Sequence, residues 1–433
     1  MSQKLKVFLL VLFIGLMFLC LFAPTSSTSI SPGDPINGAD TAWMITATAL
    51  VLFMTPGLSF FYGGMVGSKN IISTMLQSFV CMGLVSLIWV VVGFSLCFGD
   101  SLGGVIGDPR TFFMFSGVGG STHKALSPTI PLILFALFQM KFAIITPALI
   151  TGSFAERVKF SSYIVFVSLF TIFIYAPLAH MTWHPDGILR QLGVLDFAGG
   201  TVVHMSAGIA ALVGAWFLGR RHSHISKEIH RPANIPYVIL GTGMLWFGWF
   251  GFNAGSALSA SDLATLAFAT TNTASAAAML TWMLMDSLKG HKPSALGACI
   301  GAVVGLVAIT PAAGFVTVPH SLFIGALASV ISHFAVHIKS RSQLDDTLDV
   351  FPCHGVGGIA GMILTGVFAK DLGLYYGTYK TFVIHIAALL MITLFCVVMS
   401  YVLYEITDRI VPLRVGKEDE ILGLDISQHA ESV

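Results

Sequence analysis

Two histidines in this 433-residue chain stand in the same short pattern. His204 is followed by three residues and then Gly-Ile-Ala, and so is His354. Imidazole gains and loses a proton near neutral pH, and two coupled imidazoles can hold one proton jointly. A single buried histidine is most simply a packed ring that hydrogen-bonds a backbone carbonyl, but a repeated pair favours function. If the rings meet, the pair suits handling a small base or relaying a proton better than coordinating a bare alkali cation.

Both histidines lie in long apolar stretches, and the composition of the whole chain explains why. Hydrophobic residues make up 55% and charged residues only 10%, whereas soluble domains carry about 25% charged residues. The mean hydropathy of +0.85 therefore excludes a water-soluble globule. The net charge of +1 implies no basic surface for nucleic acid. The six cysteines stand singly, without a CxxC pair, which supports neither a disulfide framework nor a zinc module.

The apolar stretches have the length of membrane spans. A helix needs about 20 apolar residues to cross a bilayer core, and backbone groups in lipid must be satisfied within a helix or a closed barrel. Span length and the absence of period-two alternation favour helices, so we predict an all-α membrane protein with eleven transmembrane helices. The predicted spans are 41–65, 71–98, 129–154, 160–180, 198–219, 234–256, 264–285, 294–313, 321–338, 354–369 and 380–404.

Positive charge between the spans indicates their orientation. If the N-terminus lies outside, fourteen Lys and Arg residues fall in the inside breaks and the tail, and five in the outside breaks. This bias is the one that cytoplasmic loops carry. We therefore predict a transmembrane domain over residues 40–405, with the mature N-terminus outside, and a cytoplasmic tail over residues 406–433.

The N-terminus has the shape of a secretory signal peptide. Lys4 and Lys6 precede an apolar run from Val7 to Ala23, and a Ser/Thr-rich stretch follows. We predict that residues 1–27 are cleaved; the competing interpretation is a retained extra helix.

The two histidine motifs also predict an inverted repeat. They fall in the fifth and tenth spans, so five spans separate equivalent positions and the second copy has the opposite orientation. Spans 1–5 and 6–10 would then form a pseudo-two-fold pair, with the substrate site near the midplane. Apart from Lys141 and residues near span ends, the spans contain almost no Asp, Glu, Lys or Arg. A cation filter lined by carboxylates is therefore disfavoured.

Aromatic residues and one carboxylate near the histidine spans are further candidates. Phe138 and Phe142 are four residues apart, as are Phe252 and Ser256, so each pair shares a helix face. From spacing alone, such aromatic residues are expected to face lipid or the core. Asp196 precedes the fifth span, where its carboxylate could bind a cation or cap the helix by accepting backbone N–H bonds; we favour the cap.

Longer motifs around these residues resemble those of the ammonium transporter family (Amt/Mep/Rh), and most closely its Amt/Mep branch. The resemblance extends from about Asp40 to Gly423. The motifs that carry it are Pro56-Gly-Leu-Ser-Phe-Phe-Tyr-Gly-Gly64, Ala155-Glu-Arg157, Ala179-His-Met-Thr-Trp183, Asp196-Phe-Ala-Gly-Gly-Thr-Val-Val-His204, Gly248-Trp-Phe-Gly-Phe-Asn-Ala-Gly-Ser256 and Asp349-Val-Phe-Pro-Cys-His354-Gly.

The resemblance implies a homotrimer in which each subunit has its own pore. Trp183 and Phe138 would form an outer vestibule that holds ammonium over aromatic faces, where cation–π attraction contributes roughly 0.5–2 kcal/mol. Ser256 would accept a hydrogen bond from the cation. Below the vestibule, Phe142 and Phe252 would be stacked phenyl gates.

The mechanism that follows is recruitment of ammonium, deprotonation near the gate and passage of uncharged ammonia past the twin histidines His204 and His354. Shedding the proton avoids the cost of moving a charge through an apolar pore. The alternative function is an ammonium sensor or passive gas channel on the same fold. Lys141 beside the cation site would repel ammonium, so we expect it to point away from the pore.

We expect no cofactor, no metal site and no catalytic residues. The histidines from His222 to His230 lack the spacing of a metal-binding array, so an enzyme is disfavoured. A signalling protein of the PII type is a candidate partner at the cytoplasmic face. The expected location is the cell membrane, in bacteria the inner membrane, with several passes through the bilayer.

Overall fold

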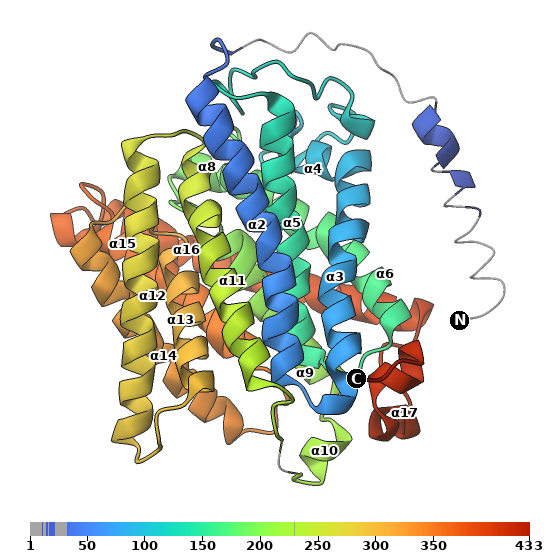
Figure 1. Ribbon diagram of the computed structural model, residues 1–433. Coiled ribbons are helices and arrows are strands. Elements are labelled where there is room, and N and C mark those ends of the chain that lie inside the picture. Colours follow the sequence, from blue (N-terminus) through green and yellow to red (C-terminus); the bar gives the residue numbers. More distant parts are fainter. Residues whose placement is uncertain (1–10, 12–13, 16, 22–32, 229) are drawn as a thin grey trace.

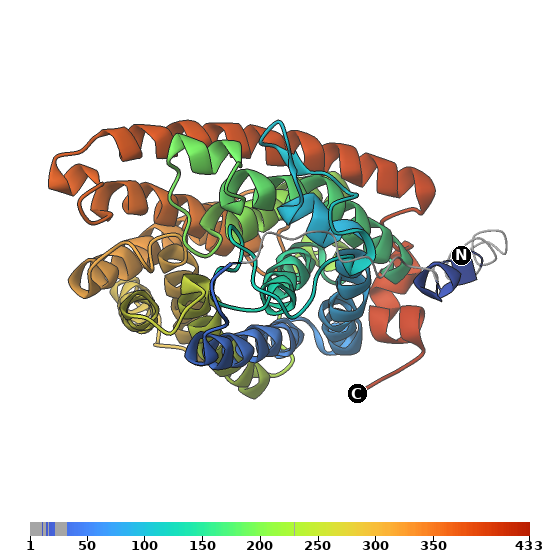
Figure 2. The same cartoon turned by 90° about the horizontal axis from the view of Figure 1, so that it is seen from above.

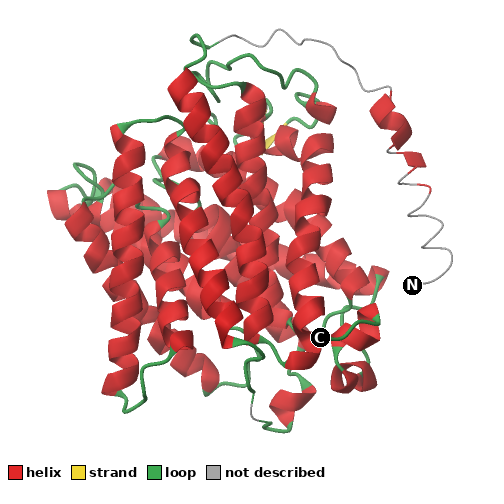
Figure 3. Cartoon of the chain, viewed as in Figure 1, coloured by secondary structure: helices red, strands yellow, loops and turns green. Residues whose placement is uncertain are grey.

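The computed structural model describes residues 11, 14–15, 17–21, 33–228 and 230–433 and is mostly helical (Figure 3). Within those ranges, strand structure is confined to the short antiparallel pair β1 (Ser101–Leu102) and β2 (Ile106–Gly107). The predicted signal peptide at 1–27 falls largely outside the described residues.

Eleven apolar helical segments coincide with the eleven predicted spans. Ten of them are long and apolar enough to cross a membrane, and the remaining one, α13, is an apolar helix of 15 residues. In chain order they are α2 (Gly38–Met65); α3 (Ile71–Ile88), η2 (Trp89–Gly93) and α4 (Phe94–Phe98); α5 (Leu132–Phe154); α6 (Phe160–Phe170), η4 (Thr171–Tyr175), α7 (Ala176–Trp183) and α8 (Ile188–Leu192); η5 (Gly200–Met205) and α9 (Ser206–Leu218); α11 (Ile235–Ala254) with η6 (Gly255–Ala257); α12 (Asp262–Leu288); α13 (Ala295–Ile309); α14 (Val318–Ser340); η7 (Phe351–Val356) and α15 (Gly357–Phe368); and α16 (Lys380–Ile410).

The helices run side by side in one bundle (Figure 1). The short helices α10 (His222–Ile225) and α17 (Lys417–Leu422) lie with the C-terminus at one end of it, which we call the tail end. Viewed along the bundle, the red helix α16 runs obliquely along one side (Figure 2).

Small residues let central helices approach closely, as membrane helices do where dispersion rather than water drives packing. On α11, a Cβ placed on Gly241 would lie 2.3 Å from the backbone nitrogen of Phe61 on α2. The first turns of the two histidine segments, η5 and η7, are both π-helical. Such wide turns are rare and often mark functional positions. Here each one carries a motif histidine, His204 or His354.

Candidate functional site

The two motif histidines meet in the core of the bundle. Nδ1 of His204 and Nδ1 of His354 lie 3.3 Å apart, and the side chains are 1% and 3% exposed. At this distance one Nδ1 donates and the other accepts, so the pair shares one hydrogen. Nε2 of His204 is buried and has no hydrogen-bond partner in the described part of the chain. It is therefore free to meet a small polar molecule.

Glycines allow this contact, because side chains at their positions would force the two histidine helices apart. A Cβ on Gly208 would lie 2.1 Å from the backbone nitrogen of Gly355. Similarly, a Cβ on Gly358 would lie 2.9 Å from the carbonyl oxygen of Gly200. The Gly-rich sequence of the two motifs thus brings the histidines to hydrogen-bonding distance.

Trp249 forms a wall of the site that the sequence analysis did not identify. Its ring stacks on His204 with centroids 5.3 Å apart and an interplanar angle of 18°. Its indole N–H donates to Oγ1 of Thr310 over 2.9 Å. The sequence did contain one indication of this role: Trp249 stands three residues before Phe252, and so lies on the same face of α11.

Phe142 and Phe252 stack at one end of the histidine pair. Their centroids are 4.2 Å apart at 26°, and both rings are buried. The centroid of Phe252 lies 6.1 Å from that of His204. Phe252 and the two histidines line a cavity of about 10 Å³, close to the least space that holds one water molecule. It is lined by Met54, Leu58, Phe61, Ile145, Leu149, Val203, His204, Leu245, Trp249, Phe252, Val303 and His354.

A second aromatic layer lies beyond the stacked pair. The rings of Phe138 and Trp183 approach Phe142 edge to face, at 5.0 and 5.7 Å. Ser256 Oγ donates to the carbonyl oxygen of Phe252 over 2.8 Å, which leaves its lone pairs free to accept a bond. The structure thus gathers Trp183, Phe138, Ser256, Phe142 and Phe252 in one place, although they come from three different segments.

Asp196 holds the start of the His204 helix. One carboxylate oxygen accepts from the N–H groups of Gly199 and Gly200, and the other accepts from the N–H and the hydroxyl of Thr201, all within 2.5–2.8 Å. Its carbonyl oxygen accepts from the indole of Trp183 over 3.2 Å. Asp196 therefore connects the Trp183 ring to the first turn of η5.

Lys141 lies between Phe138 and Phe142 in sequence but does not line the cavity. Phe138 and Phe142 are fully buried, whereas Lys141 is half-buried, on the same face of α5 as the partly exposed Leu137.

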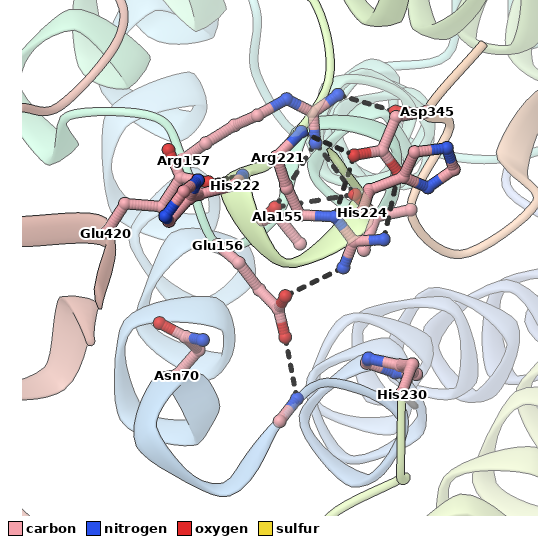
Figure 4. A network of polar contacts seen from close by, with 12 residues as sticks. Asn70, Ala155, Glu156, Arg157, Arg221, His222, His224, His230, Asp345 and Glu420 are labelled. Atoms are coloured by element: carbon pink, nitrogen blue, oxygen red, sulfur yellow. Dashed lines mark hydrogen bonds and ion pairs between the residues drawn. The ribbon is translucent and has the colours of Figure 1, made fainter. Parts of the chain in front are cut away.

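Ionic contacts concentrate at the tail end of the bundle, around a pocket of about 370 Å³ (Figure 4). Arg221 lies between Glu156 and Asp345, at 2.7 and 2.9 Å. Burial alone raises the pKa of the Asp345 carboxyl, but hydrogen bonds from Arg221 and the charge of Arg157 outweigh it, so the pKa falls below its ordinary value. Burial likewise opposes ionisation of Glu156, and the charge of Arg221 again lowers the pKa overall.

Histidines also line this pocket. His222, His224 and His230 all face it (Figure 4), and Nε2 of His230 bonds the carbonyl oxygen of Met65. Over the described ranges, no group of three or more His, Cys, Asp or Glu residues is placed to hold a metal ion. The contacts of these histidines are with other residues of the pocket region, and they join separate segments of the chain to one another.

Comparisons with known proteins agree on one family. A family model described as "Ammonium Transporter Family" matches residues 42–433. The chain is 46% identical over 413 residues to an ammonium transporter of Aquifex aeolicus, covering 94% of this chain and 96% of the relative. It is 43% identical over 402 residues to an ammonium transporter of Bacillus subtilis, covering 90% and 97%.

Solved structures give the same result. Mep2 of Saccharomyces cerevisiae matches with a TM-score of 0.83 and 34% identity, over 88% of each chain. A structure of a sensor Amt protein matches with a TM-score of 0.82 and 30% identity, over 90% of this chain and 98% of the other.

Proposed function

We propose a mechanism for this chain from the premise that it belongs to the ammonium transporter family, and so carries ammonium or ammonia across a membrane. It is a multi-pass membrane protein, and its family consists of transporters rather than enzymes. Ammonium is recruited beside Trp183, Phe138 and Ser256, gives up its proton at the phenyl gate, and crosses as ammonia past His204 and His354.

Recruitment is supported by the groups that surround the outer layer. The rings of Trp183 and Phe138 offer aromatic faces that attract a cation, more strongly as water is removed. The hydroxyl of Ser256 already donates to a backbone carbonyl, so it meets ammonium as an acceptor. Asp196 adds a negative charge nearby while its oxygens cap η5.

Deprotonation is supported by the cavity below the gate, which is the observation that carries the proposal. Its volume of about 10 Å³ leaves no room for a hydration shell, and no carboxylate is among the residues that line it. An ion there would lose its water without gaining a counter-charge, at a cost of several kcal/mol or more. Ammonia has no charge to desolvate, and Nε2 of His204 offers it a polar partner.

Two alternatives keep the same fold. In a passive gas channel, the proton returns to the side from which ammonium came. A sensor is the other alternative, and it is favoured by the likeness to a sensor Amt protein. We favour transport because the hydrogen-bonded His204–His354 pair offers the proton a route past the buried cavity.

The predicted topology and partners complete the proposal. We infer that the tail end faces the cytoplasm, because most of the Lys and Arg residues between spans fall at that end. The π-helical first turns of η5 and η7 support the inverted repeat. A homotrimer, a PII-type partner at the tail end and cleavage of residues 1–27 remain part of the proposal.

The proposed function is tested by recording currents on proteoliposomes immobilised on a solid support. An ammonium pulse is expected to produce a saturable current that His204→Ala abolishes. An internal pH change without current would favour the gas channel. The absence of both a current and an internal pH change would favour the sensor.

A further inference from the structure

His385 on α16 is a fully buried imidazole outside the pore, and both of its ring nitrogens have backbone partners. Nδ1 lies 2.8 Å from the carbonyl oxygen of Met362, and Nε2 lies 3.0 Å from the backbone nitrogen of Leu195. A carbonyl only accepts and an amide only donates, so these contacts fix the tautomer. Nδ1 carries the hydrogen, and Nε2 accepts from Leu195.

The two partners of this ring belong to the two segments that build the site. Leu195 immediately precedes Asp196, whose carboxylate caps η5 and whose carbonyl oxygen accepts from Trp183. Met362 lies on α15, which continues directly from the turn that carries His354. The imidazole of His385 therefore joins the Asp196 loop to the His354 helix.

Neighbouring residues also contact the His385 ring and the Asp196 loop. A Cβ on Gly366, one turn beyond Met362, would lie 3.4 Å from Nδ1 of His385. At the other side of the loop, the N–H of Phe197 donates to the carbonyl oxygen of Pro311 over 3.1 Å. The Asp196 loop is thus held from both sides, by α16 through Leu195 and by the turn that follows α13 through Phe197.

We propose that His385 is a positioning residue for the recruitment site: by accepting the N–H of Leu195, it fixes the loop from which Asp196 orients Trp183. The role rests on the proposed function. Loss of that bond frees the loop, shifts the indole of Trp183 and weakens recruitment more than it slows passage through the pore. The half-saturation concentration of ammonium then rises, and the maximal current changes less.

Two substitutions separate this role from simple packing. The side-chain amide of Gln reaches the place of Nε2, so His385→Gln keeps an acceptor for Leu195 and loses the bond to Met362. The amide of Asn reaches only the place of Nδ1, so His385→Asn keeps a donor for Met362 and loses the bond to Leu195. Because both substitutions replace the ring by a smaller polar group, each variant serves as the control for the other.

The experiment combines two measurements on the full chain in lipid. Ammonium-concentration series of transport current give the half-saturation concentration and the maximal current. Hydrogen exchange, read by mass spectrometry on peptides covering 194–201, reports the bond to Leu195 without depending on transport. We expect His385→Asn to raise the half-saturation concentration about tenfold, because it leaves the partly buried N–H of Leu195 without its acceptor, and to speed exchange in 194–201. His385→Gln is expected to stay within about twofold of the wild type in both.

Three outcomes would overturn the inference. In the first, His385→Asn speeds exchange in 194–201 but leaves the half-saturation concentration unchanged, so the bond has no part in recruitment. In the second, His385→Gln and His385→Asn are equally impaired, so the ring acts only by packing. In the third, the wild type gives neither current nor pH change although its exchange pattern is intact, which overturns the proposed function itself.

Discussion

His204 and His354 face each other through their Nδ1 atoms, 3.3 Å apart, while Nε2 of His204 is buried and has no hydrogen-bond partner among the described residues. The pair therefore has one hydrogen bond between its members and one ring nitrogen left to meet a small molecule in the cavity that both histidines line. In the proposed mechanism, this arrangement separates contact with ammonia, at Nε2 of His204, from transfer of a proton between the two Nδ1 atoms.

Replacing His354 by Asn separates these events experimentally. Asn keeps a polar group near the place of Nδ1 but does not titrate near neutral pH. We expect the ammonium-driven current to fall at least about tenfold, while the internal pH change caused by ammonia persists. His291→Asn, in an exposed loop, is the matched control. An unchanged current in His354→Asn would exclude the histidine pair as the proton route.

Thr310 is expected to hold Trp249 against His204. Val has nearly the same shape as Thr but cannot accept the indole N–H, so Thr310→Val leaves a buried donor unpaired at a cost of about 1–3 kcal/mol. Thermal unfolding should show that loss, and transport should fall with it because Trp249 stacks on His204. Thr310→Ser keeps the hydroxyl and should behave as wild type.

Ser256 is expected to set affinity rather than rate. Ser256→Ala removes the acceptor beside the aromatic layer, and the half-saturation concentration of ammonium should rise about tenfold. The control is Ser259→Ala, which lies in the following loop and bonds the carbonyl oxygen of Ala257. Equal effects of both substitutions on half-saturation would show that the loop, not the Ser256 hydroxyl, is responsible.

The ion pairs at the tail end predict how stability depends on pH. The folded-state pKa values of Asp345 and Glu156 lie below their ordinary values. Their contribution is therefore complete above the unfolded-state pKa values of about 4 and is lost as pH falls through them towards the folded-state values. Melting temperatures in detergent should be steady above about pH 5 and should decrease below about pH 4.

Asp345→Asn should reduce that acid dependence and destabilise the protein at neutral pH by roughly 3 kcal/mol, because Arg221 loses a buried partner. The comparison is Asp108→Asn, whose partner Arg110 is exposed. A surface pair of this kind contributes little, so its melting curve should match that of the wild type. Identical curves for Asp345→Asn and wild type at every pH would contradict the prediction.

The tail is expected to cap a membrane helix. The carboxylate of Asp425 accepts from the N–H groups of Ile72 and Ser73, at the first turn of α3. Asp425→Ala should cost about 1 kcal/mol of stability, as loss of a helix cap does, and should speed hydrogen exchange in the first turn of α3. Glu418→Gln, on the exposed side of α17, should leave that exchange unchanged.

The helical segments of this fold were predictable from the sequence because span length and hydropathy are local properties. Residues 294–313 illustrate the limit, since the helix α13 covers only Ala295–Ile309 and the chain then turns at Thr310 to support Trp249. His204 and His354 could also be identified as candidate functional residues, because a titratable group in an apolar span differs clearly from its neighbours. Trp249 could not be identified in this way, because it resembles any other aromatic residue of a membrane helix.

The apolar segments, the titratable residues inside them and the family that the motifs resemble could all be read from the sequence. Three contacts became visible only in the packed molecule: the histidines meet through Nδ1, Phe142 stacks on Phe252, and His385 accepts the N–H of Leu195. Each of these contacts joins residues far apart in the chain, and its length depends on how closely two helices approach. That approach is set by glycines on both partners, as at Gly208 and Gly355, and so it is a property of the packed pair rather than of either segment.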